Sequence, residues 1–123
     1  MISLLFWLYL INSILLINHE IDSAFWKEWD LFKLGGGIRL FLIIHFPLLF
    51  IVLYGLILLY QQTLWGLVIS LFLSLSGLTA FIIHMYFIRK GYKEFNVPVS
   101  LAILYSTFII SVIQGVITLY LMT

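Results

Sequence analysis

Four long apolar segments constrain this chain more than any other feature of its sequence. They cover residues 1–22, 38–60, 64–88 and 97–122, and each reaches the roughly 20 residues that an α-helix needs to cross the hydrocarbon core of a bilayer. Hydrophobic residues make up 64% of the chain and charged residues 9%, which excludes a water-soluble domain, whose apolar share is about 45–50%. We therefore predict an all-α, polytopic membrane protein built as a four-transmembrane-helix bundle.

The rest of the composition narrows the chemistry and the partners. The segments and their connections use all 123 residues, so we expect a single integral membrane domain over residues 1–123, without an extramembrane domain. The chain has no cysteine, which leaves imidazole and carboxylate groups as its strong metal ligands. Without a basic tract, no nucleic-acid partner is expected. The expected partners are the lipid bilayer and, within it, a lipid-like substrate or a partner membrane protein.

The charge distribution predicts the orientation in the membrane. Residues 1–22 lack the basic start and the small-residue cleavage site of a signal peptide, so we expect a retained helix. Four crossings place the connections at residues 26–37 and 89–96 on one side and both termini on the other. All six basic residues belong to the first side: Lys27, Lys33, Arg39, Arg89, Lys90 and Lys93. The positive-inside rule then places this end in the cytoplasm and both termini outside the cell membrane.

The three histidines lie just inside the charged end. At a rise of 1.5 Å per residue, His19, His45 and His84 fall about 7.5–12 Å inside the neighbouring basic residues. Their levels agree within roughly one helical turn. On the second segment Pro47 follows His45 closely and should kink the helix beside it. Three histidines at one level of a membrane protein are typical of a functional site.

Helical phase indicates which way two of the histidines point. His84 continues a stripe of small residues that allows close helix packing, formed by Gly66, Ser70, Ser74 and Gly77. His19 shares a face with further polar side chains: Asn12, Asp22, Ser23 and Trp26. We therefore expect both histidines to face other helices. Close packing also predicts that Gly77→Leu disrupts the protein more than Leu73→Ala does.

These residue types suit a transition metal. The expected ligands are the nitrogens of His19, His45 and His84 with an oxygen of Asp22 or Glu20, which favours zinc, iron or manganese. Haem fits less well, because a porphyrin needs a wide slot between two facing histidines. No catalytic residue can be assigned, and the candidates are Glu20, Asp22 and Glu28. The His-Glu-x-x-His zinc motif is absent, because Ser23 occupies the position of its second histidine.

Two classes of function remain open. In one, a metal site at the cytoplasmic end of the bundle acts on a lipid-like substrate by hydrolysis or oxidation. In the other, the protein is a non-enzymatic accessory subunit or small transporter, in which the same residues form a structural polar network or a proton relay. An enzyme requires an open metal position and a lateral opening to lipid. A structural network would be closed, with every polar group hydrogen-bonded.

Several short pieces of the sequence also carry a family resemblance. They occur in the order His19-Glu20-Ile21-Asp22, Glu28-Trp29, His45-Phe46-Pro47-Leu48, Gly77 with His84 and Phe87, and Tyr92-Lys93-Glu94-Phe95 with Ser100. In order and spacing, over nearly the whole chain, they resemble a family of small, uncharacterised bacterial four-helix integral membrane proteins with a His-Glu-hydrophobic-Asp signature. The resemblance implies marked residues at the three histidines and nearby acids. The chain departs from the pattern at Arg89-Lys90-Gly91, where another histidine is expected.

The predicted orientation can be tested with reporter fusions. Because every basic residue belongs to one end, a reporter fused to the C-terminus is expected to be active only outside the cytoplasm. A second reporter, one that is active only in the cytoplasm, should be active when inserted into the connection at residues 26–37 and inactive at the C-terminus. A C-terminal fusion that is active only in the cytoplasm would reverse the orientation and move the histidines to the outer face.

Overall fold

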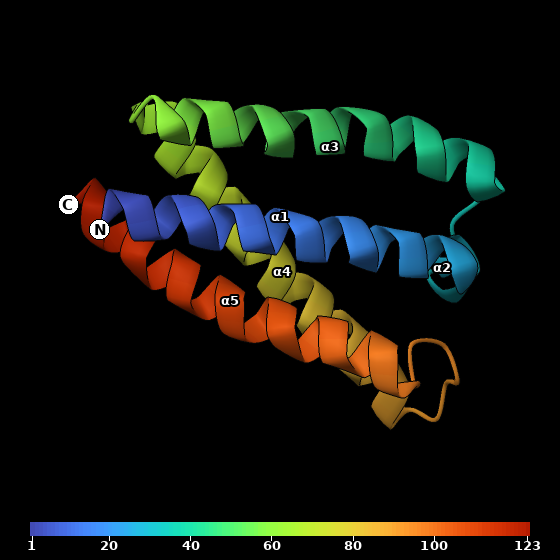
Figure 1. The fold of residues 1–123 in the computed structure, drawn as a ribbon. Coiled ribbons are helices and arrows are strands. Elements are labelled where there is room, and N and C mark those ends of the chain that lie inside the picture. Colours follow the sequence, from blue (N-terminus) through green and yellow to red (C-terminus); the bar gives the residue numbers. More distant parts are fainter.

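The computed structural model describes residues 1–123 as five helices without strands (Figure 1). The helices are α1 (Ile2–Phe25), α2 (Glu28–Leu31), α3 (Gly37–Tyr60), α4 (Leu64–Arg89) and α5 (Pro98–Met122). All except α2 are long and apolar enough to cross a membrane. This confirms the predicted all-α fold with four helices able to span a bilayer.

The four long helices are neighbours in the cyclic order α1, α3, α4 and α5. α1 also contacts α4, whereas α3 and α5 do not touch. Figure 1 shows both termini at one end, beside the turn between α3 and α4, and shows α2 and the α4–α5 connection at the other end. From their shared turn, α3 and α4 diverge toward the end that holds α2. Both charged connections therefore lie away from the termini.

Local sequence explains where the helices begin and end. The Thr63 hydroxyl accepts a hydrogen bond from the Gly66 amide and caps the start of α4. Pro98 occupies the first position of α5, where its missing amide hydrogen costs nothing. Lys27 adopts a left-handed conformation with φ 53° and separates α1 from α2. The sequence predicts only a loop at residues 26–37, because the single helical turn of α2 is too short to produce a periodic pattern.

Close approach at Gly77 sets the contact between α4 and α5. A Cβ atom at Gly77 would overlap the Ser111 hydroxyl and would lie 3.0 Å from Cγ2 of Thr107. The predicted inward stripe on α4 is confirmed, because its members and His84 are all buried. Leu73 belongs to the same buried face and is only 1% exposed. Its truncation would leave a cavity that costs about 2–5 kcal/mol, so Leu73→Ala is not the mild comparison expected from sequence.

A polar network joins α1, α4 and α5 beside this contact. The Asn12 side-chain amide donates to Ser111 Oγ at 3.0 Å and to Gln114 Oε1 at 2.9 Å. Gln114 in turn donates to the carbonyl and hydroxyl oxygens of Ser70 at 3.0 and 3.1 Å. Thr118 completes the chain through a 2.8 Å hydrogen bond with Ser70. Every buried side-chain polar atom of these residues has a partner, as a structural network within apolar helices requires.

The Gly77 contact predicts a clear difference between two substitutions. Gly77→Leu forces α4 and α5 apart and should cost about 1–3 kcal/mol or more, because the interface has no space for the added atoms. Ala102→Leu places the same side chain at an exposed position of α5 and should leave stability nearly unchanged. Thermal aggregation in a mild detergent compares the two variants. Equal transition temperatures would show that this interface does not hold the helices together.

Candidate metal centre

The fold brings His19 and His84 into direct contact. His19 lies seven residues after Asn12, and His84 lies seven residues after Gly77. Seven residues are close to two helical turns, and both Asn12 and Gly77 pack in the interior between α1, α4 and α5. Each histidine therefore continues a buried helix face. The side chains are 4% and 2% exposed, and the two Nε2 atoms lie 3.1 Å apart.

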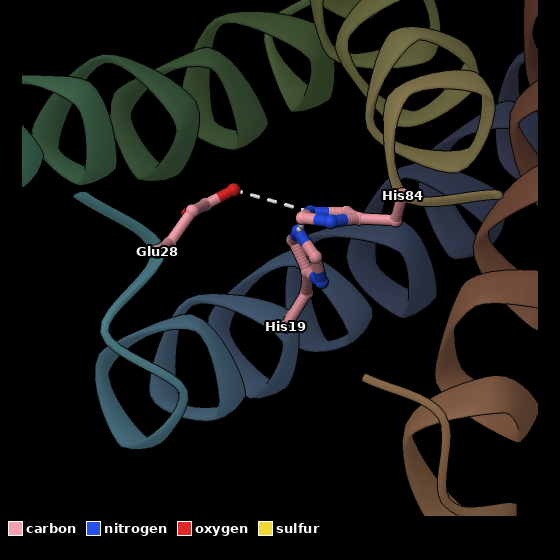
Figure 2. Close-up of side chains that lie close together, drawn as sticks. All are labelled: His19, Glu28 and His84. Atoms are coloured by element: carbon pink, nitrogen blue, oxygen red, sulfur yellow. Dashed lines mark hydrogen bonds and ion pairs between the residues drawn. The ribbon is translucent and has the colours of Figure 1, made fainter. Parts of the chain in front are cut away.

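Glu28 on α2 completes a cluster with these two histidines. Its Oε1 lies 3.1 Å from Nε2 of His84, and Figure 2 shows the carboxyl group and the His19 ring both directed at the His84 ring. One donor atom from each of the three side chains lies within 4.8 Å of the others. Burial acts to raise the pKa of Glu28. The hydrogen bond from His84 and the charges of the two histidines outweigh this effect, so the pKa of Glu28 lies below its ordinary value.

Phe95 holds the two histidine rings from the side of the α4–α5 connection. It is fully buried, and its ring centroid lies 4.1 Å from that of His84 and 5.7 Å from that of His19. Phe95 adopts a φ of 63°, a left-handed conformation that costs a bulky residue about 1–3 kcal/mol. Burial of the aromatic ring offsets this strain. Phe32 stacks near His84 with a centroid distance of 6.0 Å.

His45, the third predicted ligand, lies outside this cluster and pairs with Glu20. Its Nδ1 donates to the carbonyl oxygen of Phe41 at 2.6 Å, which leaves Nε2 directed at the Glu20 carboxylate. Asp22, the other predicted oxygen ligand, is half-buried, and its Oδ2 has no hydrogen-bond partner. The structure thus brings two of the predicted histidines together, while the third contacts Glu20 beside them.

A cavity of about 540 Å³ connects the cluster with the Glu20–His45 pair. The histidines and carboxylates that line it are His19, Glu20, Glu28, His45 and His84. The rest of its wall comes mainly from apolar side chains of α3, α4 and the segment after α2. All the predicted site residues except Asp22 therefore face one shared space.

Several buried polar atoms at this end lack hydrogen-bond partners. They include Nδ1 of His19, Nδ1 of His84, Oδ2 of Asp22, Oγ of Ser23, Nε1 of Trp26 and Oγ of Ser100. Leaving a buried polar group unpaired costs about 1–3 kcal/mol. The polar atoms of the network around Gln114 all have partners within the protein, whereas these atoms do not, so each requires a partner from outside the chain.

The sequence predicts Glu28 as a candidate base and does not predict it as a metal ligand. Its position depends on the left-handed Lys27 and on α2, which direct the chain back toward His84, and no local pattern encodes that path. Phe95 was part of the family resemblance, yet its role beside the histidines was not expected. One feature of the sequence indicates this role for Phe95: it is an apolar aromatic residue within the charged 89–96 connection. Such a residue tends to bury its ring against the rest of the protein.

The protein is therefore an all-helical chain with four helices able to span a membrane. At one end, two buried histidines and a half-buried glutamate form a cluster. The chain belongs to a family of unknown function, DUF6713, whose sequence profile matches residues 5–121. No curated protein and no solved structure matches the chain.

The role of Phe95 can be measured by truncation. Phe95→Ala removes a fully buried ring and should lower stability by about 3–5 kcal/mol, since both histidine rings lose their packing surface. Tyr92→Ala removes an exposed ring from the same connection and should change stability by no more than about 0.5 kcal/mol. Thermal unfolding in detergent measures both. A Phe95→Ala variant as stable as Tyr92→Ala would rule out this packing role.

Proposed function

We propose that this protein is a membrane metalloprotein that binds a transition metal through Nε2 of His19, Nε2 of His84 and a carboxylate oxygen of Glu28. One observation carries the proposal: donor atoms from two buried histidines and the half-buried Glu28, on three helices, lie within 4.8 Å of one another. Nε2 of His84 lies 3.1 Å from both Nε2 of His19 and Oε1 of Glu28. Ligands at about 2.0–2.1 Å from a tetrahedral zinc ion lie about 3.3 Å apart. The two distances that involve His84 are therefore close to those of a zinc site, and a small shift of His19 and Glu28 toward each other would complete it.

Three protein ligands leave one position of a tetrahedral metal open. Two histidines and one carboxylate are a donor set used by catalytic zinc sites, and the same set binds iron in other sites. The open position would face the cavity, where a bound water or a substrate oxygen would be polarised by the metal. Glu20 and His45 line that cavity and are the proposed proton-handling pair. A lipid-like substrate would undergo hydrolysis or oxidation there.

The orientation predicted from charge completes this proposal. The single membrane domain would lie in the cell membrane with its metal site at the cytoplasmic end and both termini outside. This assignment is supported by the six basic residues, which belong to the connections at residues 26–37 and 89–96 and to the adjoining helix ends. Those connections lie at the end opposite the termini (Figure 1).

A second candidate function is a proton relay without a metal, in an accessory subunit or small transporter. One observation favours it: two histidine–glutamate pairs, Glu20 with His45 and Glu28 with His84, line the same cavity. Titratable groups in such an arrangement can pass a proton between helices. The two candidates differ in one property, which is whether the purified protein binds a metal.

Elemental analysis of protein purified in a mild detergent tests the metal site. One zinc, iron or manganese ion per chain is expected after reconstitution. His19→Ala, His84→Ala and Glu28→Gln should each weaken metal binding by about tenfold or more, because each removes one of three ligands. Asp30→Asn changes an exposed carboxylate two residues from Glu28 and should retain the metal.

His45→Ala separates the two possible ligand sets. Retention of the metal is expected if His19, Glu28 and His84 are the ligands. The opposite result is loss of the metal from His45→Ala and retention of the metal by Glu28→Gln. That result would support the ligands expected from sequence, in which His45 binds the metal with Asp22 or Glu20. Wild-type protein that binds none of the three metals would refute the proposal and favour the proton relay.

A further inference from the structure

The cavity beside the metal centre opens sideways between α3 and α4. These helices meet at the Thr63 turn and diverge toward α2 (Figure 1), and the cavity lies between their diverging halves. Ile44 on α3 and Leu75 on α4 both line it and are 53% and 54% exposed. Side chains that line a cavity and also lie on the outer surface form its mouth. In a membrane, that mouth would face the acyl chains of the lipids.

The wall that α4 contributes is long and apolar. It extends from Phe72 to His84, which is about 18 Å at 1.5 Å per residue. One leaflet of the hydrocarbon core is about 15 Å thick. The hydroxyls on this wall, from Ser76 and Thr79, donate to carbonyl oxygens of their own helix and so offer no free donor to a ligand. The groove thus matches one extended acyl chain in length and in polarity.

The inner end of the cavity has a different chemistry. A divalent metal with an ionised Glu28 leaves one positive charge among the donor atoms. The Glu20–His45 pair adds no net charge, whichever partner holds the shared proton. An uncompensated buried charge is unfavourable, so an anionic oxygen group at the open metal position would be stabilised. At the same end, six basic residues outnumber the acids other than Glu20 and Glu28, which are Asp22, Asp30 and Glu94. The remaining charge is therefore positive and adds a field of the same sign.

We infer that this cavity binds a long-chain fatty acid, which enters from the membrane between α3 and α4 and places its carboxylate at the metal. The volume of about 540 Å³ is within the range of roughly 300–1,000 Å³ typical of small-molecule sites. The head-group position rests on the proposed metal function. The position of the chain rests on the cavity alone.

Equilibrium binding of radiolabelled palmitate to zinc-loaded protein in detergent tests this inference. Saturable binding of one palmitate per chain is expected. Ala80→Phe fills the cavity wall on α4 and should weaken palmitate binding by about tenfold or more, with zinc stoichiometry unchanged. Ala102→Phe makes the same substitution on exposed α5 and should retain both ligands. If Ala80→Phe does not fold, Ser76→Leu replaces it, because the larger side chain narrows the groove at a second position. Ser76→Leu should likewise weaken palmitate binding by about tenfold or more with zinc stoichiometry unchanged.

Competition and metal removal decide the identity of the ligand. Hexadecanol should compete about tenfold more weakly than palmitate when zinc is bound, because it lacks the carboxylate, and this difference should disappear after chelation. Zinc binding without saturable palmitate binding would overturn this inference and leave the metal function intact. Equal palmitate binding with and without zinc would overturn the head-group assignment. Phosphatidylcholine that competes as well as palmitate would identify a phospholipid chain as the occupant.

Discussion

The close contact between α4 and α5 at Gly77 is the constraint on which the rest of the structure depends. The absence of a side chain there lets Ser111 approach the α4 backbone, and it places Ser70, Gln114 and Asn12 within hydrogen-bonding distance. These bonds fix the rotation of three helices about their axes. The histidines follow from that rotation, because each lies two turns beyond a residue of this interior.

The magnitudes indicate what the network contributes. Hydrogen bonds between membrane helices average about 0.6 kcal/mol each, so the network adds modest stability. An unpaired amide in an apolar interior costs several kcal/mol, and a rotated helix would leave Asn12 or Gln114 in that state. The main effect of the network is therefore to disfavour other arrangements of the helices, and its direct contribution to stability is smaller. The histidine cluster can remain open because helix packing elsewhere fixes its position.

Sequence predicts the parts of this molecule that depend on helix period and membrane thickness. The four apolar helices, the buried face of α4 and the shared level of His19 and His84 all follow from residue spacing. The environment of His45 does not, because only four residues of α3 are buried and its apolar sequence gives no clear phase. Glu28 and Phe95 were not expected at the cluster, because both are positioned by non-helical residues with positive φ, at Lys27 and at Phe95 itself.

X-ray absorption spectroscopy of the metal-loaded protein tests the central claim most directly, because it reports the atoms bound to the metal. The account predicts two imidazole nitrogens at about 2.0–2.1 Å from zinc and one carboxylate oxygen at a similar distance. The multiple scattering of two histidine rings should be present in wild-type protein and should be halved in His84→Ala. A first shell of oxygen atoms alone, without imidazole scattering, would contradict the claim that His19 and His84 share a metal ion.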